Sequence, residues 1–246
     1  PAGVTLAPEG GAHQSTITAS VGAELPNLTS VEPAYSTEVD WLLCDAFDQV
    51  GRANGTSIYL RLSTRPIDQA PFAAVLAVEG EERLRQHVLA GGYRLRDAPD
   101  DGRPGVTIVT TGVTAPNALA AAEELDAEGV QATVIHLTSP DRVYRSWRDG
   151  FARSTATARV VRVPSRLHRL VPAVERRRPV VSVHDAASHS LAWIGSALGT
   201  RQYALGVDRF GESGTIADLH RITGIDAGSV VNAALIAVSE SEPFDE

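Results

Sequence analysis

The sequence predicts an α/β fold, in which a mostly parallel sheet is flanked by helices. Two apolar runs, Val106–Thr111 and Val130–Leu137, are rich in valine, isoleucine and threonine, as buried strands are. Between them, residues 115–128 repeat apolar side chains at helical spacing, and Gly112 begins the turn into that helix. A strand–helix–strand unit of this kind predicts a right-handed crossover between parallel strands.

Composition limits the size and the partners of the protein. With 246 residues, of which 43% are hydrophobic, the chain can bury a substantial core in one large domain or two ordinary ones. The formal net charge of −8 argues against nucleic acid or an anionic membrane surface as the main partner. No run of 18 apolar residues occurs, so no membrane span is expected.

Three residue types are scarce or missing, and each scarcity bears on function. The absence of lysine excludes Schiff-base chemistry, and the absence of methionine suggests a fragment or a processed chain. The single cysteine, Cys44, excludes a disulfide within the chain and suits a reducing cytoplasm. Because Cys44 lies in an apolar helical pattern, we expect it to be a buried small residue rather than a nucleophile.

Residues 1–68 are expected to form a first unit. A polar, glycine-rich turn at residues 8–15 carries His13 and Gln14, and Ser15 can begin a short helix. The remaining pattern predicts a short strand at 28–33, a helix at 36–50 and a buried strand at 57–62.

Residues 69–105 are interpreted as a linker region, which opens on a proline-containing polar stretch without periodicity. Within it, an arginine-rich stretch from Glu81 to Leu89 predicts a helix with a charged, solvated face, and Gly91–Leu95 predicts a strand or hairpin arm.

Residues 106–246 are expected to form the second unit, which contains the sheet. After the strand–helix–strand unit, a helix from Pro140 is followed by strands at 180–185 and 202–205, with a helix at 191–198 between them. The last helix is expected at 227–238. Before it, Tyr203–Gly214 is interpreted as a strand end and a glycine loop, in which Ser213 caps a helix that begins at Ile216.

One stretch is strongly basic. Residues 153–178 hold eight arginines and one acid, Glu175. These arginines can form a patch for an acidic partner, but ion pairs with acids elsewhere in the chain are the favoured interpretation.

Several motifs resemble those of one enzyme family. Gly206-Val207-Asp208-Arg209-Phe210-Gly211-Glu212-Ser213-Gly214, and Ile225 to Leu235 after it, resemble the end of the C-terminal domain of transketolase-like, thiamine-diphosphate-dependent enzymes. Glu9-Gly10-Gly11-Ala12-His13-Gln14 resembles the histidine–glutamine turn of their pyrimidine-binding domain. The similarity is closest to the homodimeric first, decarboxylating component of the pyruvate dehydrogenase complex. Residues 1–68 would then be the second half of a pyrimidine-binding domain and residues 106–246 a transketolase C-terminal-like domain.

The resemblance implies roles for individual residues. His13 would lie at the substrate channel as a catalytic residue, and Gln14, Arg61 and Arg65 would bind substrate. The alternative for the two arginines is a surface or linker salt bridge. No cofactor-binding and no metal-binding residue is expected in this chain, since the family's Gly-Asp-Gly motif and its activating glutamate are absent from it.

The same resemblance implies cofactors and partners of the whole enzyme. Thiamine diphosphate and Mg²⁺ would be bound by the full enzyme and not by this chain alone. A second copy, or a complementary chain that carries the diphosphate-binding domain, would complete it, and a lipoyl acyltransferase component would accept the product. Neither nucleic acid nor a membrane is expected as a partner.

Other functions stay open at this stage. Sugar-phosphate ketol transfer of the transketolase type would use Arg61 or Arg65 for phosphate, and a non-catalytic assembly or dimerisation domain would explain the missing cofactor motif. His184, Asp185 and His189 are close enough in sequence to suggest a metal site, but they lack the spacing of a standard one. The corner at Gly112 could hold an anion on helix amides, although a plain turn is favoured.

Overall fold

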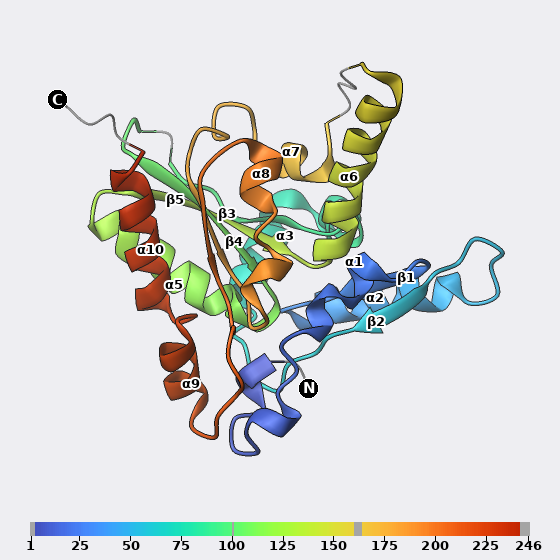
Figure 1. Cartoon of the computed structure of the whole chain (residues 1–246), viewed down its shortest axis with the longest axis horizontal. Helices are drawn as coiled ribbons and strands as arrows, with labels where there is room; N and C mark the ends of the chain where they lie inside the picture. Colours follow the sequence, from blue (N-terminus) through green and yellow to red (C-terminus); the bar gives the residue numbers. More distant parts are fainter. Residues whose placement is uncertain (1–2, 100, 160–163, 242–246) are drawn as a thin grey trace.

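The computed structural model describes residues 3–99, 101–159 and 164–241, and it contains two sheets (Figure 1). The larger sheet has the strand order β3-β5-β4-β6-β7, in which β3 is antiparallel to β5 and the other neighbours are parallel. Its strands are β3 (Tyr93–Arg96), β4 (Gly105–Thr111), β5 (Gln131–Leu137), β6 (Val180–Val183) and β7 (Gln202–Leu205). The predicted mostly parallel α/β fold is therefore confirmed.

A few residues of the sequence-based assignments are not covered by this description. The residues outside the described ranges include 1–2 of the first expected unit and 242–246 of the second. They also include Asp100 of the expected linker and Arg162 of the basic stretch.

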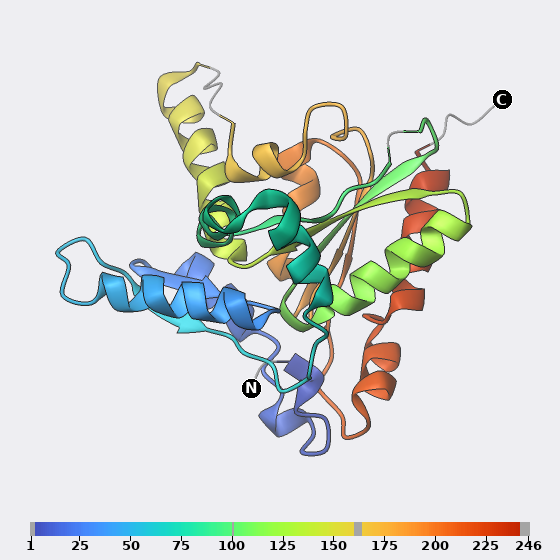
Figure 2. The ribbon, with the colours of Figure 1, turned by 180° about the vertical axis from the view of Figure 1, so that it is seen from behind.

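Helices cover both faces of the larger sheet, as Figures 1 and 2 show from opposite sides. One face carries α5 (Ala115–Ala127) and α10 (Ala227–Ser239), and the other carries α6 (Pro140–Thr157), α7 (Arg166–Leu170) and α8 (Ile194–Leu198). Every residue of β5 is buried, which is why its sequence is a continuous run without polar–apolar alternation. The alanines of α5 leave room for α10 to pack closely against it.

The first unit is a smaller layer. Strands β1 (Leu28–Val31) and β2 (Ser57–Leu60) pair in parallel, and α1 (Val21–Glu24) and α2 (Ser36–Gln49) accompany them. Glu38 fixes the start of α2, because its carboxylate accepts hydrogen bonds from the backbone N–H groups of Ala34 (2.7 Å) and Tyr35 (2.9 Å).

The region that we interpreted as a linker is structured. It contains α3 (Ala70–Glu79), α4 (Glu81–Leu89) and β3, which is an edge strand of the larger sheet. An aromatic cluster holds it in place: Phe72 lies 5.4 Å from Tyr35 and 5.9 Å from Tyr93, measured between ring centroids. The helix predicted at Glu81–Leu89 and the strand predicted within 91–95 are present as α4 and β3, while the assignment of 69–105 as the region between two domains stays a prediction.

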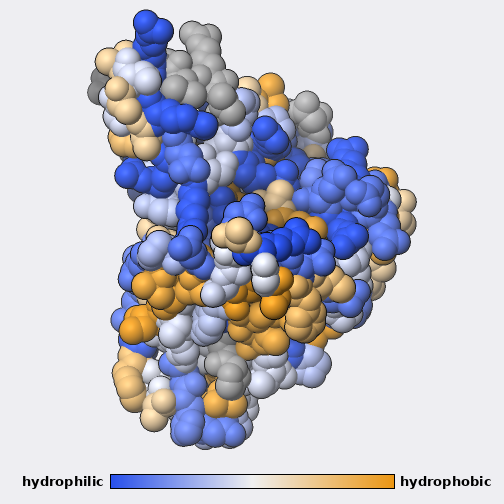
Figure 3. All heavy atoms as spheres, turned by 90° about the vertical axis from the view of Figure 1, so that its right-hand side faces the viewer, coloured by the Kyte–Doolittle hydropathy of each residue, from blue (hydrophilic) through white to orange (hydrophobic). Residues whose placement is uncertain are grey.

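Two expectations of burial in the first unit are wrong. Strand β2 is only half-buried, and Cys44 on α2 is exposed, as are Phe47 (72%) and Val50 (78%) at the end of the same helix. Figure 3 shows hydrophobic side chains gathered in the lower half of the face that carries this unit. The physical reason is that β2 has one strand neighbour among the described residues, so nothing in this part of the chain covers these apolar groups.

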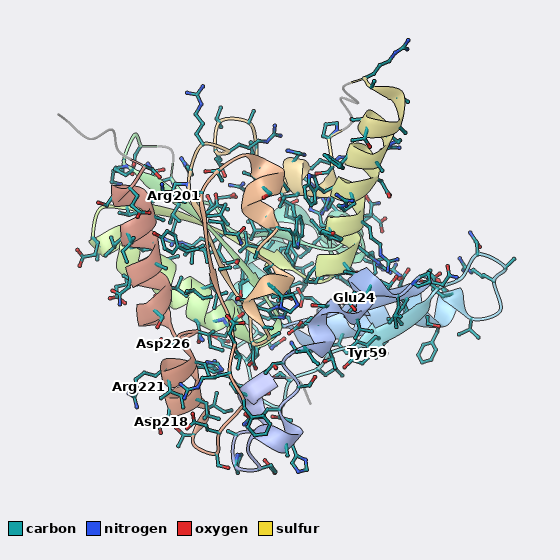
Figure 4. The ribbon with its side chains drawn as sticks, viewed as in Figure 1. Glu24, Tyr59, Arg201, Asp218, Arg221 and Asp226 are labelled. Carbon is teal, nitrogen blue, oxygen red and sulfur yellow. The ribbon has the colours of Figure 1, made fainter. Side chains whose placement is uncertain are left out.

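The C-terminal helices begin differently from the prediction. Helix α9 (Ile216–Thr223) is capped by Thr215, whose hydroxyl accepts from the N–H of Asp218 at 3.1 Å, and not by Ser213. Asp218 also pairs with Arg221 on the outer side of α9 (Figure 4). The stretch Ile216–Ser239 is long and apolar enough in composition to cross a membrane, but it is divided at Gly224 into α9 and α10, and α10 packs on the sheet.

Candidate functional site

The two units meet at the carboxyl ends of β4 and β6. The connections from these neighbouring strands lead to opposite faces of the sheet, which is where α/β proteins form a ligand crevice. Here two residues of the first unit, Glu32 and Arg61, fill that place. The side chain of Glu32 lies against Gly112, which follows β4 and has a left-handed backbone (φ 54°). The backbone N–H of Glu32 donates to Thr138 O at 2.8 Å.

Glu32 is the centre of a buried cluster of charged and polar groups. Arg61 forms a close ion pair with one carboxylate oxygen, and His184 Nε2 lies 2.8 Å from the other. Burial alone would raise the pKa of Glu32, but Arg61 and His184 together bring the pKa below its ordinary value. Arg61 also donates to the carbonyls of Ser15 (2.9 Å) and Asp185, so one guanidinium joins three segments.

Asp185 is the second buried acid of this junction. Its Oδ1 accepts from the N–H of Val4 at 2.8 Å, whereas Oδ2 is buried without a hydrogen-bond partner among the described residues. Burial raises the pKa of Asp185 to about 6. Gly3 packs directly on this carboxyl group in a left-handed conformation (φ 59°), so a side chain at position 3 would collide with it.

The histidine–glutamine turn directly precedes Ser15, whose carbonyl accepts from Arg61. His13 is exposed at the end of a short 3₁₀ helix (Gly11–His13). Gln14 is buried, and its amide donates to Glu212 O at 3.0 Å. The structure thus brings the turn against the 206–214 loop, two motifs that are about two hundred residues apart in the sequence.

This contact is close and specific. A side chain at Gly11 would meet Phe210 and the carbonyl of Gly211, and a side chain at Gly10 would meet Ser213. Gln14 therefore holds the turn on the loop, while the imidazole of His13 stays accessible to solvent.

The two candidate arginines differ. The side chain of Arg61 is 1% exposed and already paired with Glu32, and its binding of substrate stays a prediction. Arg65 is half-buried and donates to Asn117 Oδ1 at 3.2 Å. Burial lowers its pKa, while nearby Asp185 acts in the opposite direction.

Asn117 also contacts His220, a residue that sequence analysis did not identify. Asn117 Nδ2 lies 2.9 Å from His220 Nδ1, and burial together with Arg65 lowers the pKa of this histidine to about 4. Nothing in the sequence marks His220, because it is a single histidine inside an amphipathic helix.

The suggested metal site does not form. His184 is bound to Glu32 and Ser190, Asp185 to Val4, and His189 to Ser20. Among residues 3–99, 101–159 and 164–241, no three histidine, cysteine or acidic side chains are placed to hold a metal ion. At Gly112, the group that lies against the corner is the side chain of Glu32 itself.

Comparison with known proteins gives consistent results. The family model described as the transketolase-like TK C-terminal domain matches residues 91–226, which is more than half of the chain. The pyruvate dehydrogenase E1 component of Mycobacterium tuberculosis is 29% identical over 245 residues, which are 98% of this chain and 25% of that protein. The chain thus spans about a quarter of the length of this relative.

Solved structures show the same fold. The transketolase from Leishmania mexicana matches 99% of this chain and 30% of its own, with a TM-score of 0.65 and 20% identity. A chain described as a split gene transketolase, inactive beta4 tetramer, matches 98% of this chain and 65% of its own, with a TM-score of 0.57 and 19% identity.

Proposed function

Because the chain belongs to the transketolase-like family through its C-terminal domain, we propose that it is part of a thiamine-diphosphate-dependent 2-oxo acid dehydrogenase of the pyruvate dehydrogenase type. The observation that carries this proposal is the similarity to a pyruvate dehydrogenase E1 component over 98% of the chain. The chain contributes a wall of the substrate channel, a surface for assembly and the C-terminal domain.

His13 is the residue with a chemical role in this proposal. Thiamine diphosphate, when bound, supplies the electron sink for the loss of carbon dioxide from a 2-oxo acid. The exposed imidazole of His13 can donate a proton to a substrate oxygen or hold it by a hydrogen bond. Gln14 positions this histidine by fixing the turn on Glu212, and its contact with substrate stays a prediction.

The binding of the cofactor's diphosphate and of Mg²⁺ is assigned in this proposal to another chain or to another part of the protein. This sequence has no Gly-Asp-Gly motif. The half-exposed strand β2, with one neighbour among the described residues, and the exposed apolar end of α2 offer a surface on which such a chain can dock. The split gene transketolase is a precedent for a family member divided between genes.

A reconstitution experiment tests the proposal. Pyruvate decarboxylation is measured with thiamine diphosphate and Mg²⁺, for this protein alone and together with a chain that carries the diphosphate-binding domain. We expect activity only for the pair, together with acetyl transfer to a lipoyl acyltransferase domain. The variant His13→Ala should lower kcat by 10²–10⁴-fold.

His189→Ala, which also removes an exposed histidine, is the matched control and should leave kcat unchanged. Equal losses in the two variants would remove His13 from the catalytic machinery. Inactivity of every reconstituted pair, with pyruvate and with a ketose phosphate, would favour a non-catalytic assembly or dimerisation domain.

Ketol transfer of the transketolase type is the second candidate, since the family model and the solved structures carry that name. It needs a cation for the substrate phosphate, and Arg65 is the candidate that remains after the burial of Arg61. If Arg65→Gln raises KM for a ketose phosphate tenfold or more without changing KM for pyruvate, this candidate replaces the first.

A further inference from the structure

An arginine-rich cavity lies on the opposite side of the molecule from the His13 turn, at the end where α6 and α7 are seen in Figure 1. It has a volume of about 300 Å³. Its polar lining consists of Arg142, Arg153, Arg166, Arg169, Ser146 and Ser165. None of the described residues that line it is acidic.

Three of these four arginines have no acidic partner within the described parts of the chain. Arg142 pairs with Asp45 at 2.8 Å, but Arg153, Arg166 and Arg169 form no ion pair there. Glu175, the one acid of the basic stretch, is used by Arg94 at 3.0 Å. For these three residues the favoured prediction, pairing with acids elsewhere, is therefore wrong.

Arg166 shows that the positive charge is uncompensated. It donates to backbone carbonyls of His87 (3.3 Å) and Gly92, which fixes the guanidinium at the wall of the cavity. Its Nε is buried without a hydrogen-bond partner in the described structure. Burial and the neighbouring Arg169 both lower the pKa of Arg166.

A second cavity, of about 310 Å³, lies on the other side of Arg166 and Arg169. Its cations Arg83 and Arg94 are already paired, with Glu79 and Glu175 respectively, so it adds space rather than free charge.

We propose that this arginine cavity binds the phosphate group of a small phosphorylated ligand. Guanidinium groups match phosphate oxygens in paired hydrogen bonds, and a dianion compensates the charge that the chain leaves unpaired. Ser146 accepts from the N–H of Arg166 at 2.9 Å, so its own hydroxyl proton is available to the ligand. This site is separate from the His13 turn and does not depend on the proposed function.

Calorimetric titration with inorganic pyrophosphate, at low ionic strength, tests the proposal. The unmodified protein should bind it, and the double variant Arg153→Gln with Arg169→Gln should bind at least tenfold more weakly. The single change Arg153→Gln should also weaken binding, and Arg148→Gln is its control, because Arg148 is exposed on the same helix, its replacement removes the same single charge, and it does not line the cavity. It should bind within twofold of the unmodified protein.

Three results would overturn the proposal. One is the absence of binding to the unmodified protein at millimolar pyrophosphate. Another is an equal loss of affinity in Arg148→Gln, which would indicate general charge attraction. The third is equally tight, cavity-dependent binding of an acidic peptide, which would make the site a protein contact. Circular dichroism checks folding of each variant, and the single change Arg153→Gln, at an exposed position, repeats the test if the double variant unfolds.

Discussion

Arg61 is the residue on which the junction between the two units depends most. Its guanidinium is buried with Glu32 and reaches carbonyls from two other segments. Replacement by methionine would leave the Glu32 carboxylate without its cation. We therefore expect Arg61→Met to lower the free energy of unfolding by about 3–5 kcal/mol, measured by urea denaturation.

Arg52→Met is the control for that measurement. Arg52 is exposed and lies 3.9 Å from Asp48, a geometry that contributes at most about 1 kcal/mol. Similar losses for the two variants would mean that the buried ion pair does not hold the units together.

The raised pKa of Asp185 predicts that the stability of the folded protein falls as the pH rises. Its folded-state pKa of about 6 is above the ordinary value of 3.8, so the folded protein holds this proton more tightly than the unfolded chain. The contribution to stability is complete below pH 3.8 and is lost as the pH rises through 6, by about 3 kcal/mol in total. Asp185→Asn should therefore gain stability relative to the unmodified protein between pH 4 and pH 7.

The measurement is the free energy of unfolding across that pH range, with Asp40→Asn, at an exposed position of α2, as the reference. A constant difference between Asp185→Asn and the unmodified protein would show that Asp185 does not titrate in this window.

At the scale of elements, the residue that caps α9 differs between the sequence-based prediction and the structure. Thr215 caps the helix, whereas the sequence pattern indicated Ser213. Thr215→Ala should cost about 1 kcal/mol of stability. Ser213→Ala should cost less than half of that, as measured by thermal unfolding. A larger loss at position 213 would support the original assignment.

The sequence was sufficient to predict the central strands and their helices, because β4 and β5 are buried on both sides and their apolar runs are unbroken. For β3, which has four residues, two of them arginines, the sequence indicated a strand but not its antiparallel place at the edge of the larger sheet. The prediction that β2 and Cys44 are buried was wrong. An amphipathic pattern indicates that an apolar face packs on some surface, but it does not say whether the same chain provides that surface.

The same limit applies to the candidate site. The His13–Gln14 turn could be identified, since its residues are adjacent in the sequence. The Glu32–Arg61–His184 cluster could not, because Glu32 and His184 are separated by 152 positions and each has an ordinary local context. Only the packing of the first unit on the carboxyl ends of β4 and β6 brings these residues together.

At the scale of the whole molecule, the exposed thiol of Cys44 reports on assembly. Cys44 lies on α2 near Phe47 and the half-buried β2. In the isolated protein it should react rapidly with a thiol reagent such as dithiobisnitrobenzoate. Addition of a chain with the diphosphate-binding domain should slow the reaction tenfold or more, and an unchanged rate under saturating conditions would place the assembly surface elsewhere.

The outer edge of β1 has a consequence for the order in which this chain can fold. The backbone groups that β1 does not share with β2 are satisfied from α6 and the turn before it: Asp141 accepts from Ser30 N at 2.9 Å, Ser139 donates to Ser30 O, and Arg145 donates to Leu28 O. On the ribosome, these partners emerge more than a hundred residues after β1. The outer edge of β1 therefore stays without these partners until the start of α6 has also been synthesised, and such contacts of long sequence separation form late in folding.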